Sequence, residues 1–500
     1  MHRSARTDGL PGASSNGVSR DGHAETAPRT DGVPGAPSNG HVEPRVRAAR
    51  AAGPLTLAEL RREVAAGRID TVRVAVTDAQ GRLKGKLYDA GHFLEQVADG
   101  GAEVCAYVLA TDVDMRPLDG FALASWSSGY QDLRVRPDPR TIRRLPWQPG
   151  TALVHADAVT EDGRPVTVAP RQMLHHQLAR LAALGLSVKA GLETEFVLYK
   201  GRYGELAETG YHGLRPVTEE NLDYALDHDP VQDAYLRDLA VALAGAGLPV
   251  EAVKTESAPG QVEITFPYGD ALAACDAHPL LKHAARTVGA RAGLAPTFMA
   301  APETGLGNGL HLHVSLWRED RPVLADPDGT PSALARQAIA GLLDLLPDLA
   351  PLYAPNTNSY KRFAPDSFAP TRLAWGMDNR TCAVRVVGHG DGLHLEVRVP
   401  GADANPYLAL SAALAAVLHG IERDLRPPAP YEGSAYRADE VPRIPATLDD
   451  AVRAFAASEA AAGALGPEVV AHYAHLGRIE LDVQRRTVTD AERARWFARA

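Results

Sequence analysis

The chain has 500 residues and a formal net charge of −10, with 45% hydrophobic and 23% charged residues. This length allows more than one domain and a large core, and the acidic balance argues against a nucleic-acid-binding protein. Three cysteines, Cys105, Cys275 and Cys382, are too few and too scattered for a disulfide framework, which fits a reducing cytoplasm.

The first segment, residues 1–53, is rich in Gly, Pro and Ser and has almost no large apolar side chains. Such a composition buries too little surface to offset the entropy of ordering, so we predict a disordered tail. A direct repeat begins at Arg6 and again at Arg29, and we interpret it as a duplicated flexible spacer. The chain shows neither a secretory signal nor an apolar run long enough to span a membrane.

Regular patterns begin at Leu55 and predict a small domain over residues 54–160. Residues 57–64 read as a helix, 71–77 as a strand, 85–88 as a second strand, and 92–97 as a helix. A second domain is predicted over residues 161–500. Its scaffold includes amphipathic helices at 170–185 and 231–247, a buried Ala- and Leu-rich helix at 407–421, and helices within 448–500.

Four segments of the second domain alternate polar and apolar residues, as strands with two different faces do. They cover residues 189–199, 262–266, 310–317 and 394–399. Their polar faces carry acids and imidazoles: Glu193 and Glu195 on the first, Glu263 on the second, His311, His313 and Ser315 on the third, and Glu396 on the fourth. Taken singly, each face is more readily explained as the solvated side of a sheet.

The four polar faces together point to a different role. Like charges side by side on a sheet repel each other, so a cluster of acids requires cations between them. Oxygen and imidazole ligands suit Mg²⁺ or Mn²⁺, and the absence of Cys from these segments argues against a structural zinc site. We therefore predict a site for divalent metal ions on this sheet.

The motifs around these residues resemble those of the glutamine synthetase family. They are Gly-Leu-Glu-Thr-Glu-Phe (191–196), Glu-Ser-Ala-Pro-Gly-Gln-Val-Glu (256–263), Gly-Asn-Gly-Leu-His-Leu-His (307–313), Asn-Ser-Tyr-Lys-Arg (358–362), Asn-Arg (379–380), Glu-Val-Arg (396–398) and Pro-Gly-Ala-Asp-Ala-Asn-Pro-Tyr (400–407). The resemblance implies an α+β fold, in which an N-terminal β-grasp domain precedes a catalytic domain with a curved antiparallel sheet and flanking helices. It also implies a homo-oligomer, expected as a dodecamer of two hexameric rings with active sites shared between subunits.

The resemblance also implies roles for individual residues. Glu195, Glu256 and Glu263 match ligands of one metal ion, and Glu193, His311 and Glu396 match ligands of a second ion that bridges the nucleotide phosphates. Nucleotide contacts are implied for Glu251, His313, Ser315, Arg380 and Arg385. Contacts to the glutamate or the acyl phosphate are implied for Gly307, Arg362 and Arg398.

The reaction implied is a two-step ligation with ATP. The γ-carboxylate of L-glutamate takes a phosphoryl group from ATP, and an amine then displaces phosphate from γ-glutamyl phosphate. The catalytic set expected from the resemblance includes Arg362, Arg380 and the flap position occupied by Phe368.

Two departures from glutamine synthetases bear on the amine. The flap position that carries a proton-accepting Glu in those enzymes is Phe368 here, and their Asp-Gly-Ser-Ser motif is replaced by Ala124-Ser-Trp-Ser-Ser. Phe neither accepts a proton nor attracts NH₄⁺ by charge, so we predict a larger organic amine, of the polyamine or ethanolamine class, as nucleophile. The alternatives are that Phe368 merely packs the flap of a true glutamine synthetase that uses ammonia, or that the chain is a non-catalytic relative.

Overall fold

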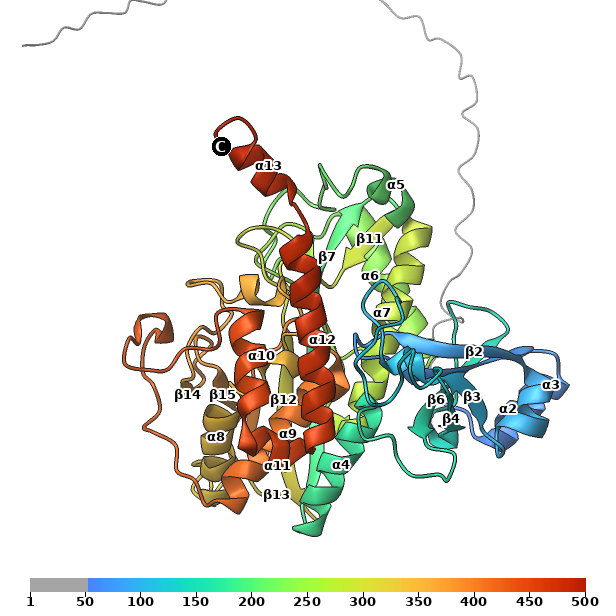
Figure 1. The fold of residues 1–500 in the computed structure, drawn as a ribbon, viewed down its shortest axis with the longest axis horizontal. Coiled ribbons are helices and arrows are strands. Elements are labelled where there is room, and N and C mark those ends of the chain that lie inside the picture. The colour runs from blue at the N-terminus through green and yellow to red at the C-terminus, as the bar shows by residue number, and fades with distance from the viewer. Residues whose placement is uncertain (1–52) are drawn as a thin grey trace, which may run out of the picture. The chain divides into compact units, whose positions relative to one another are not determined.

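The computed structural model describes residues 53–500, so the tail predicted for residues 1–53 lies almost wholly outside the described range. Its two sheets include all the segments predicted as strands, together with strands that were not predicted, and are joined and covered by helices (Figure 1). Among residues 53–500, no helix is long and apolar enough to cross a membrane.

The N-terminal part contains a six-stranded sheet with the strand order β2-β1-β6-β4-β3 and with β5 paired to β6. Its first strand lies where predicted, and Val72, Val74 and Val76 are buried. β1 runs antiparallel to β2 and parallel to β6, which makes this sheet mixed. The strands are β1 (Thr71–Thr77), β2 (Leu83–Asp89), β3 (Ala102–Cys105), β4 (Asp132–Pro137), β5 (Arg143–Arg144) and β6 (Thr151–Val159).

The two helices predicted near this sheet are present. α2 (Leu57–Ala65) begins at Thr56, whose hydroxyl accepts a hydrogen bond from Glu59 N at 3.2 Å while Thr56 N donates to the Glu59 carboxylate at 2.8 Å. The helix predicted at 92–97 is a short α3 (Ala90–His92) that continues as a π-helical turn (Phe93–Val97).

The second sheet has ten strands in the order β14-β15-β16-β12-β7-β9-β8, with β10 and β11 on β7 and β13 on β12. The prediction of an antiparallel sheet is wrong for one pair, because β14 and β15 run parallel. The strands are β7 (Ser187–Lys200), β8 (Ala252–Thr255), β9 (Gln261–Thr265), β10 (Gly269–Asp270), β11 (Leu294–Thr297), β12 (Leu310–Arg318), β13 (Arg321–Pro322), β14 (Trp375–Met377), β15 (Val384–Val387) and β16 (His394–Val397).

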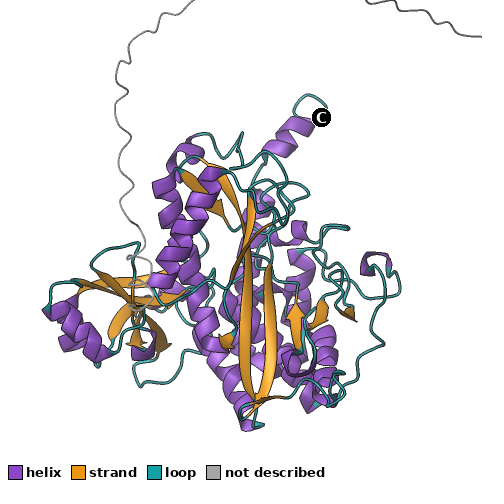
Figure 2. Ribbon diagram, turned by 180° about the vertical axis from the view of Figure 1, so that it is seen from behind, coloured by secondary structure: helices purple, strands orange, loops and turns teal. Residues whose placement is uncertain are grey.

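Helices cover one face of the long strands, which run through the centre of Figure 2 with helices behind them. Leu192 of β7 and Leu312 of β12 are buried in the same apolar cluster as the Ala- and Leu-rich α9, which packs between α8 and α4. The helices are α4 (Pro170–Ala183), α5 (Tyr203–Glu208), α6 (Pro230–Gly245), α7 (Ala271–Ala292), α8 (Ala333–Leu345), α9 (Pro406–Glu422), α10 (Leu448–Ala457), α11 (Glu459–Leu465), α12 (Pro467–Arg486) and α13 (Asp490–Trp496).

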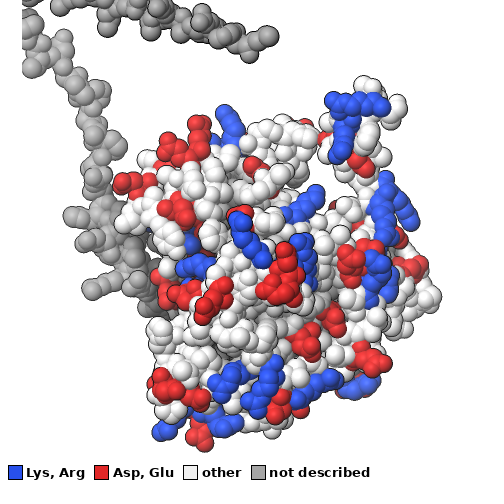
Figure 3. All heavy atoms as spheres, turned by 90° about the vertical axis from the view of Figure 1, so that its left-hand side faces the viewer, with Lys and Arg blue, Asp and Glu red and all other residues white. Residues whose placement is uncertain are grey.

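Acidic and basic side chains are interspersed on the face of the molecule shown in Figure 3. A nucleic-acid interface gathers Lys and Arg into a patch or stripe, and this face has none. The charged residues that matter for the site lie instead on the sheet.

Candidate active site

Strand register brings the predicted polar residues together. On β7, Glu195 is paired with Glu263 of β9, and Glu193 is paired with His311 of β12. Further along, His313 of β12 is paired with Glu396 of β16. Because alternate side chains of a strand point to the same face, these residues form one continuous polar surface across four strands.

One end of this surface is an all-carboxylate cluster made of Glu195, Glu256 and Glu263, whose oxygens lie within 4.8 Å of one another. Gly309 N–H donates to Glu195 Oε2 at 2.6 Å, which fixes that carboxylate. The Lys254 ammonium contacts the Glu256 carboxylate and lies 4.0 Å from Glu263 Oε2. This end therefore has three acids and one internal cation.

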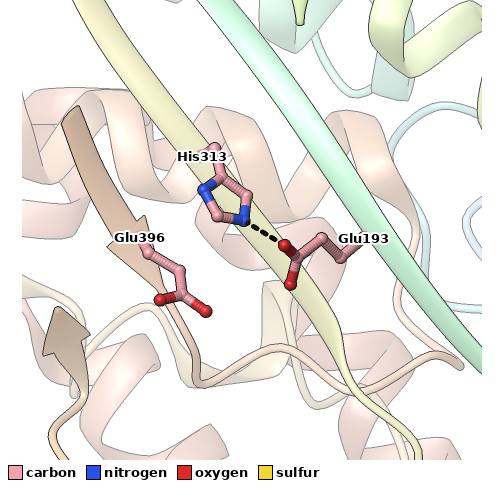
Figure 4. Close-up of side chains that lie close together, drawn as sticks. All are labelled: Glu193, His313 and Glu396. Atoms are coloured by element: carbon pink, nitrogen blue, oxygen red, sulfur yellow. Dashed lines mark ion pairs between the residues drawn. The ribbon is translucent and has the colours of Figure 1, made fainter. Parts of the chain in front are cut away.

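The other end combines carboxylates with imidazoles. His311 Nδ1 lies 3.1 Å from Glu193 Oε2 and 3.6 Å from Glu396 Oε1, so the predicted trio is brought together. His313, predicted only as a nucleotide contact, also joins this group: its Nε2 lies 2.9 Å from Glu193 Oε1 (Figure 4). Glu193, His313 and Glu396 form a potential ligand set, as do Glu193, Glu263 and His311.

The electrostatics of the two ends differ. Burial and neighbouring acids raise the pKa of Glu263 to about 9 and raise the pKa of Glu256. Burial also opposes ionisation of Glu193, but hydrogen bonds from His311 and His313 hold its pKa well below the usual range. The three acids of the all-carboxylate end therefore resist being ionised together, and a bound divalent cation would stabilise their charged forms.

Both ends suit divalent cations. The donors are carboxylates and imidazoles, the types that bind Mg²⁺ or Mn²⁺. In addition, Nε2 of His311 is buried and has no hydrogen-bond partner among residues 53–500. A buried imidazole nitrogen without a partner is costly unless a ligand satisfies it.

Arginines surround Glu396. Arg385 donates to Glu396 Oε2 at 2.9 Å, and Arg398 contacts the other oxygen of the same carboxylate. Burial opposes ionisation of Glu396, yet Arg398 and the nearby histidines lower its pKa to about 2.

Arg362 lies beside the metal-ligand surface. It is buried in a 3₁₀ turn (Ser359–Arg362) and donates to the carbonyl of Val399 at 3.1 Å. A Cβ at Gly307 would come within 2.9 Å of Arg362 Cγ, and a Cβ at Gly309 would come within 2.8 Å of its Nη2. Both glycines are therefore required by the close approach of this arginine.

A cavity of about 260 Å³ opens beside Glu193, and its lining includes three residues predicted as nucleotide contacts, namely Glu251, His313 and Ser315. The Lys189 ammonium lies 3.4 Å from the centre of the Trp317 ring at the same cavity. Arg385 and Arg380, also predicted as nucleotide contacts, line a separate open hollow of about 680 Å³, where Arg380 is exposed.

The residues that bear on the amine are solvent-facing. Phe368 is 58% exposed, with a positive φ of 56°, and its carbonyl accepts from Arg398 at 3.3 Å. The loop that replaces the Asp-Gly-Ser-Ser motif exposes Trp126 and is braced by a hydrogen bond from Trp126 N to Asp119 Oδ1 at 2.9 Å.

Several residues of the site were not predicted. Lys254 is paired with Glu263 in the β8–β9 register, and its position two residues before Glu256 was the available signal. His394 Nε2 lies 3.0 Å from His313 Nδ1, and its place on the polar face of its segment was visible in the sequence. Asp378, which accepts from Arg385 Nε at 3.0 Å, precedes β15 in a loop and had no signal.

Comparisons with known proteins agree with this geometry. The family model of the glutamine synthetase catalytic domain matches residues 167–496. The chain is 47% identical to the γ-glutamylethanolamide synthetase of Streptomyces coelicolor over 89% of this chain and 96% of that protein. It is 34% identical to a glutamate–isopropylamine ligase of a Pseudomonas species, over 86% of this chain and 95% of that protein.

A solved structure of GmaS in complex with ADP has the same fold. It superposes with a TM-score of 0.76 at 29% identity, covering 88% of this chain and 99% of that one. Together with the motifs and the assembled polar surface, these matches establish that the chain belongs to the glutamine synthetase family.

Proposed function

We propose that this protein is an ATP-dependent ligase that joins the γ-carboxylate of L-glutamate to a small organic amine through γ-glutamyl phosphate. The observation that carries the proposal is the continuous surface from Lys254 to Glu396, where three overlapping ligand sets for divalent cations lie beside buried arginines. Similarity to two proteins named as glutamate–amine ligases supports an amine rather than ammonia as the nucleophile.

In this proposal two divalent ions, Mg²⁺ or Mn²⁺, are held on the surface. Glu195, Glu256 and Glu263 would hold one. Glu193, His311 and Glu396 would hold the other, with His313 beside them. Bound there, the ions neutralise the negative charge that develops during phosphoryl transfer.

The arginines bind and orient the anionic groups. Arg362 and Arg398 hold the carboxylate of glutamate and the acyl phosphate, because a guanidinium fork matches two oxygens. Gly307 leaves the space that Arg362 needs. Arg385 and Arg380, with Glu251, His313 and Ser315, bind the nucleotide, and Arg380 counters the charge on its phosphates.

The flap decides which amine attacks. Phe368 places an aromatic ring where glutamine synthetases have a carboxylate, which suits an amine with a carbon chain and disfavours NH₄⁺. The similarity to a γ-glutamylethanolamide synthetase favours an ethanolamine-sized amine over a polyamine.

The remaining features of the proposal follow from the family. We infer a homo-oligomer, as a dodecamer of two hexameric rings, in which the N-terminal domain (residues 54–160, of the β-grasp type) lends residues to a neighbouring catalytic domain (161–500). A cytoplasmic location fits the three free cysteines, Cys105, Cys275 and Cys382.

Phosphate release tests the proposal. Purified full-length protein is assayed with Mg·ATP, L-glutamate and one amine at a time: ammonia, ethanolamine, isopropylamine, putrescine or spermine. We expect release to depend on glutamate and to be fastest with a small organic amine, and mass spectrometry to detect the γ-glutamyl amide. Preference for ammonia would identify a glutamine synthetase instead, and failure to bind Mg·ATP would identify a non-catalytic relative.

A further inference from the structure

Another cavity, of about 400 Å³, lies apart from the metal-ligand surface, and none of the residues predicted for the active site lines it. Its wall is formed by the turn after β1, by α7 and β11, by the segment before Arg362, and by α12. The charged and aromatic residues that matter are Lys282, Arg286, Phe298, Asp403 and Glu480.

One wall carries two cations that form no ion pair with the residues that the structure describes. Lys282 of α7 is only 7% exposed, and its ammonium donates to the carbonyl of Ala402 at 2.6 Å. Arg286 lies one helical turn further along α7, and both cations stand near the Phe298 ring, at 5.1 Å and 5.7 Å from its centre. Neither forms an ion pair with any carboxylate among residues 53–500.

The proximity of the two cations is unfavourable without an anion. Like charges four residues apart on a helix repel each other. Burial, followed by the charge of Arg286, lowers the pKa of Lys282 to about 7. A bound carboxylate would satisfy the two unused donors of the Lys282 ammonium and screen this repulsion.

The same cavity contains two acids, of which Asp403 interacts electrostatically with Lys282 without forming an ion pair. Glu480 of α12 forms neither a hydrogen bond nor an ion pair with the residues that the structure describes, and burial together with Asp112 raises its pKa. Asp403 Oδ1 is buried without a partner among those residues. Two unpaired cations and two incompletely satisfied acids balance in charge, which favours a zwitterion over a dianion such as phosphate.

We propose that this cavity is an effector site for a small α-amino acid, whose carboxylate binds Lys282 and Arg286 and whose ammonium binds Glu480. The volume is sufficient for an amino acid with ordered water, and the apolar Phe298 ring offers a surface for its carbon chain.

The cavity is physically connected to the active site. Asp403 Oδ2 accepts hydrogen bonds from Asn356 Nδ2 at 2.8 Å and from Ser359 Oγ at 2.7 Å. Ser359 opens the turn that ends at Arg362, so the position of Asp403 is transmitted to that arginine. The Phe298 ring also packs against Phe196 of β7, with ring centres 4.9 Å apart, next to Glu195.

This connection makes the effector role a deepening of the proposed function. Substrate glutamate and the γ-glutamyl amide product are both α-amino acids, so the site would let either one adjust the placement of Arg362. The effect on activity rests on the proposed ligase reaction, whereas binding of an amino acid in the cavity does not depend on that reaction.

Binding is tested by equilibrium dialysis on the full-length protein with L-glutamate, L-glutamine and L-alanine, and with acetate and ethylamine as single-charge controls. Arg286→Met and Glu480→Gln are compared with the matched surface variants Arg237→Met and Asp482→Asn. We expect at least one of the amino acids to bind the wild type and the matched variants, and its affinity to fall at least about tenfold in Arg286→Met and Glu480→Gln. Acetate and ethylamine should bind at least about tenfold more weakly than that amino acid.

Three results would overturn the site: equal binding in all five proteins, no amino-acid binding at all, or acetate binding as tight as that of any amino acid. Phosphate release is then measured with a saturating amine while the bound amino acid is titrated. A change in rate that persists in Asp482→Asn and disappears in Glu480→Gln supports the effector role. No change in rate would overturn that role while leaving the binding result intact, and absence of phosphate release with every amine would instead refute the proposed function.

Discussion

The Lys254 ammonium contacts the Glu256 carboxylate, so a cation from the chain itself stands within a cluster of would-be metal ligands. Burial opposes ionisation of Lys254, yet Glu263 and Glu256 raise its pKa. Lys254 therefore acts as an internal counter-ion for acids that would otherwise repel one another.

Replacing Lys254 by an uncharged residue should lower the stability of the metal-free protein and increase its affinity for metal ions. In Lys254→Met we expect the free energy of unfolding without metal to fall by about 1–2 kcal/mol, because the acids lose a charge-assisted hydrogen bond. We also expect tighter Mn²⁺ binding, because no ammonium competes for the carboxylates. Thermal unfolding and Mn²⁺ titration followed by electron paramagnetic resonance measure these effects, with Lys200→Met as an exposed control. Unchanged stability and unchanged Mn²⁺ affinity would contradict the role.

Removing space around Arg362 should impair the use of glutamate. In Gly307→Ala the new Cβ meets Arg362 Cγ at 2.9 Å, so the guanidinium must shift. We expect kcat/KM for glutamate to fall at least about tenfold, since misplacing a binding group costs transition-state stabilisation. ATP binding should persist. Gly463→Ala, whose Cβ would meet nothing within 4 Å, is the matched control. Wild-type kinetics in Gly307→Ala would show that Arg362 does not contact the substrate.

Restoring an acid in the flap should change the preferred amine. Phe368→Glu places a proton acceptor where glutamine synthetases have one, and we expect the ratio of kcat/KM for ammonia to that for ethanolamine to rise about tenfold. Because Phe368 is 58% exposed, the free energy of unfolding should change by less than about 0.5 kcal/mol. The competing rates are measured by phosphate release at fixed glutamate. A ratio that does not move would leave Phe368 as a flap residue without a role in amine choice.

Low pH should destabilise the contact between the N-terminal sheet region and α7. Trp147 Nε1 donates to His283 Nδ1 at 2.7 Å, and burial lowers the pKa of His283 to about 4. The unfolded chain, with a His pKa near 6.5, binds more protons between about pH 6.5 and 4, so this group reduces stability as pH falls through that window. Above pH 6.5 it has no such effect.

We expect His283→Asn to lessen the loss of stability between pH 6.5 and 4 by about 1–3 kcal/mol, because Asn keeps an acceptor for Trp147 without titrating. Urea unfolding at several pH values measures the slope, and His212→Asn serves as an exposed control. The same slope in His283→Asn and in the wild type would show that this histidine is not the group responsible.

The sequence predicted the polar face of the site because a strand alternates strictly and the acids and imidazoles follow that period. Both ends of each of the four patterned segments fall within two residues of the ends of an observed strand. What a single sequence does not contain is register. It was register that brought His313 beside Glu193 and Lys254 beside Glu263, and both pairings were missed.

Contacts made by loop residues could not be predicted from the sequence for the same reason. Asp378 meets Arg385 across a short connection whose course depends on the parallel pairing of β14 and β15. Nothing in the local pattern distinguishes a parallel pair of short strands from an antiparallel one. The effector cavity likewise depends on residues from distant segments, such as Lys282 and Glu480, that meet only in the folded chain.

Glu263 belongs to two of the three potential ligand sets, with Glu195 and Glu256 on one side and with Glu193 and His311 on the other. A carboxylate shared in this way cannot bind the two ions independently, so binding of the first ion changes the affinity for the second. Titrations of the two positions should accordingly be coupled, so that occupancy of one changes the affinity of the other.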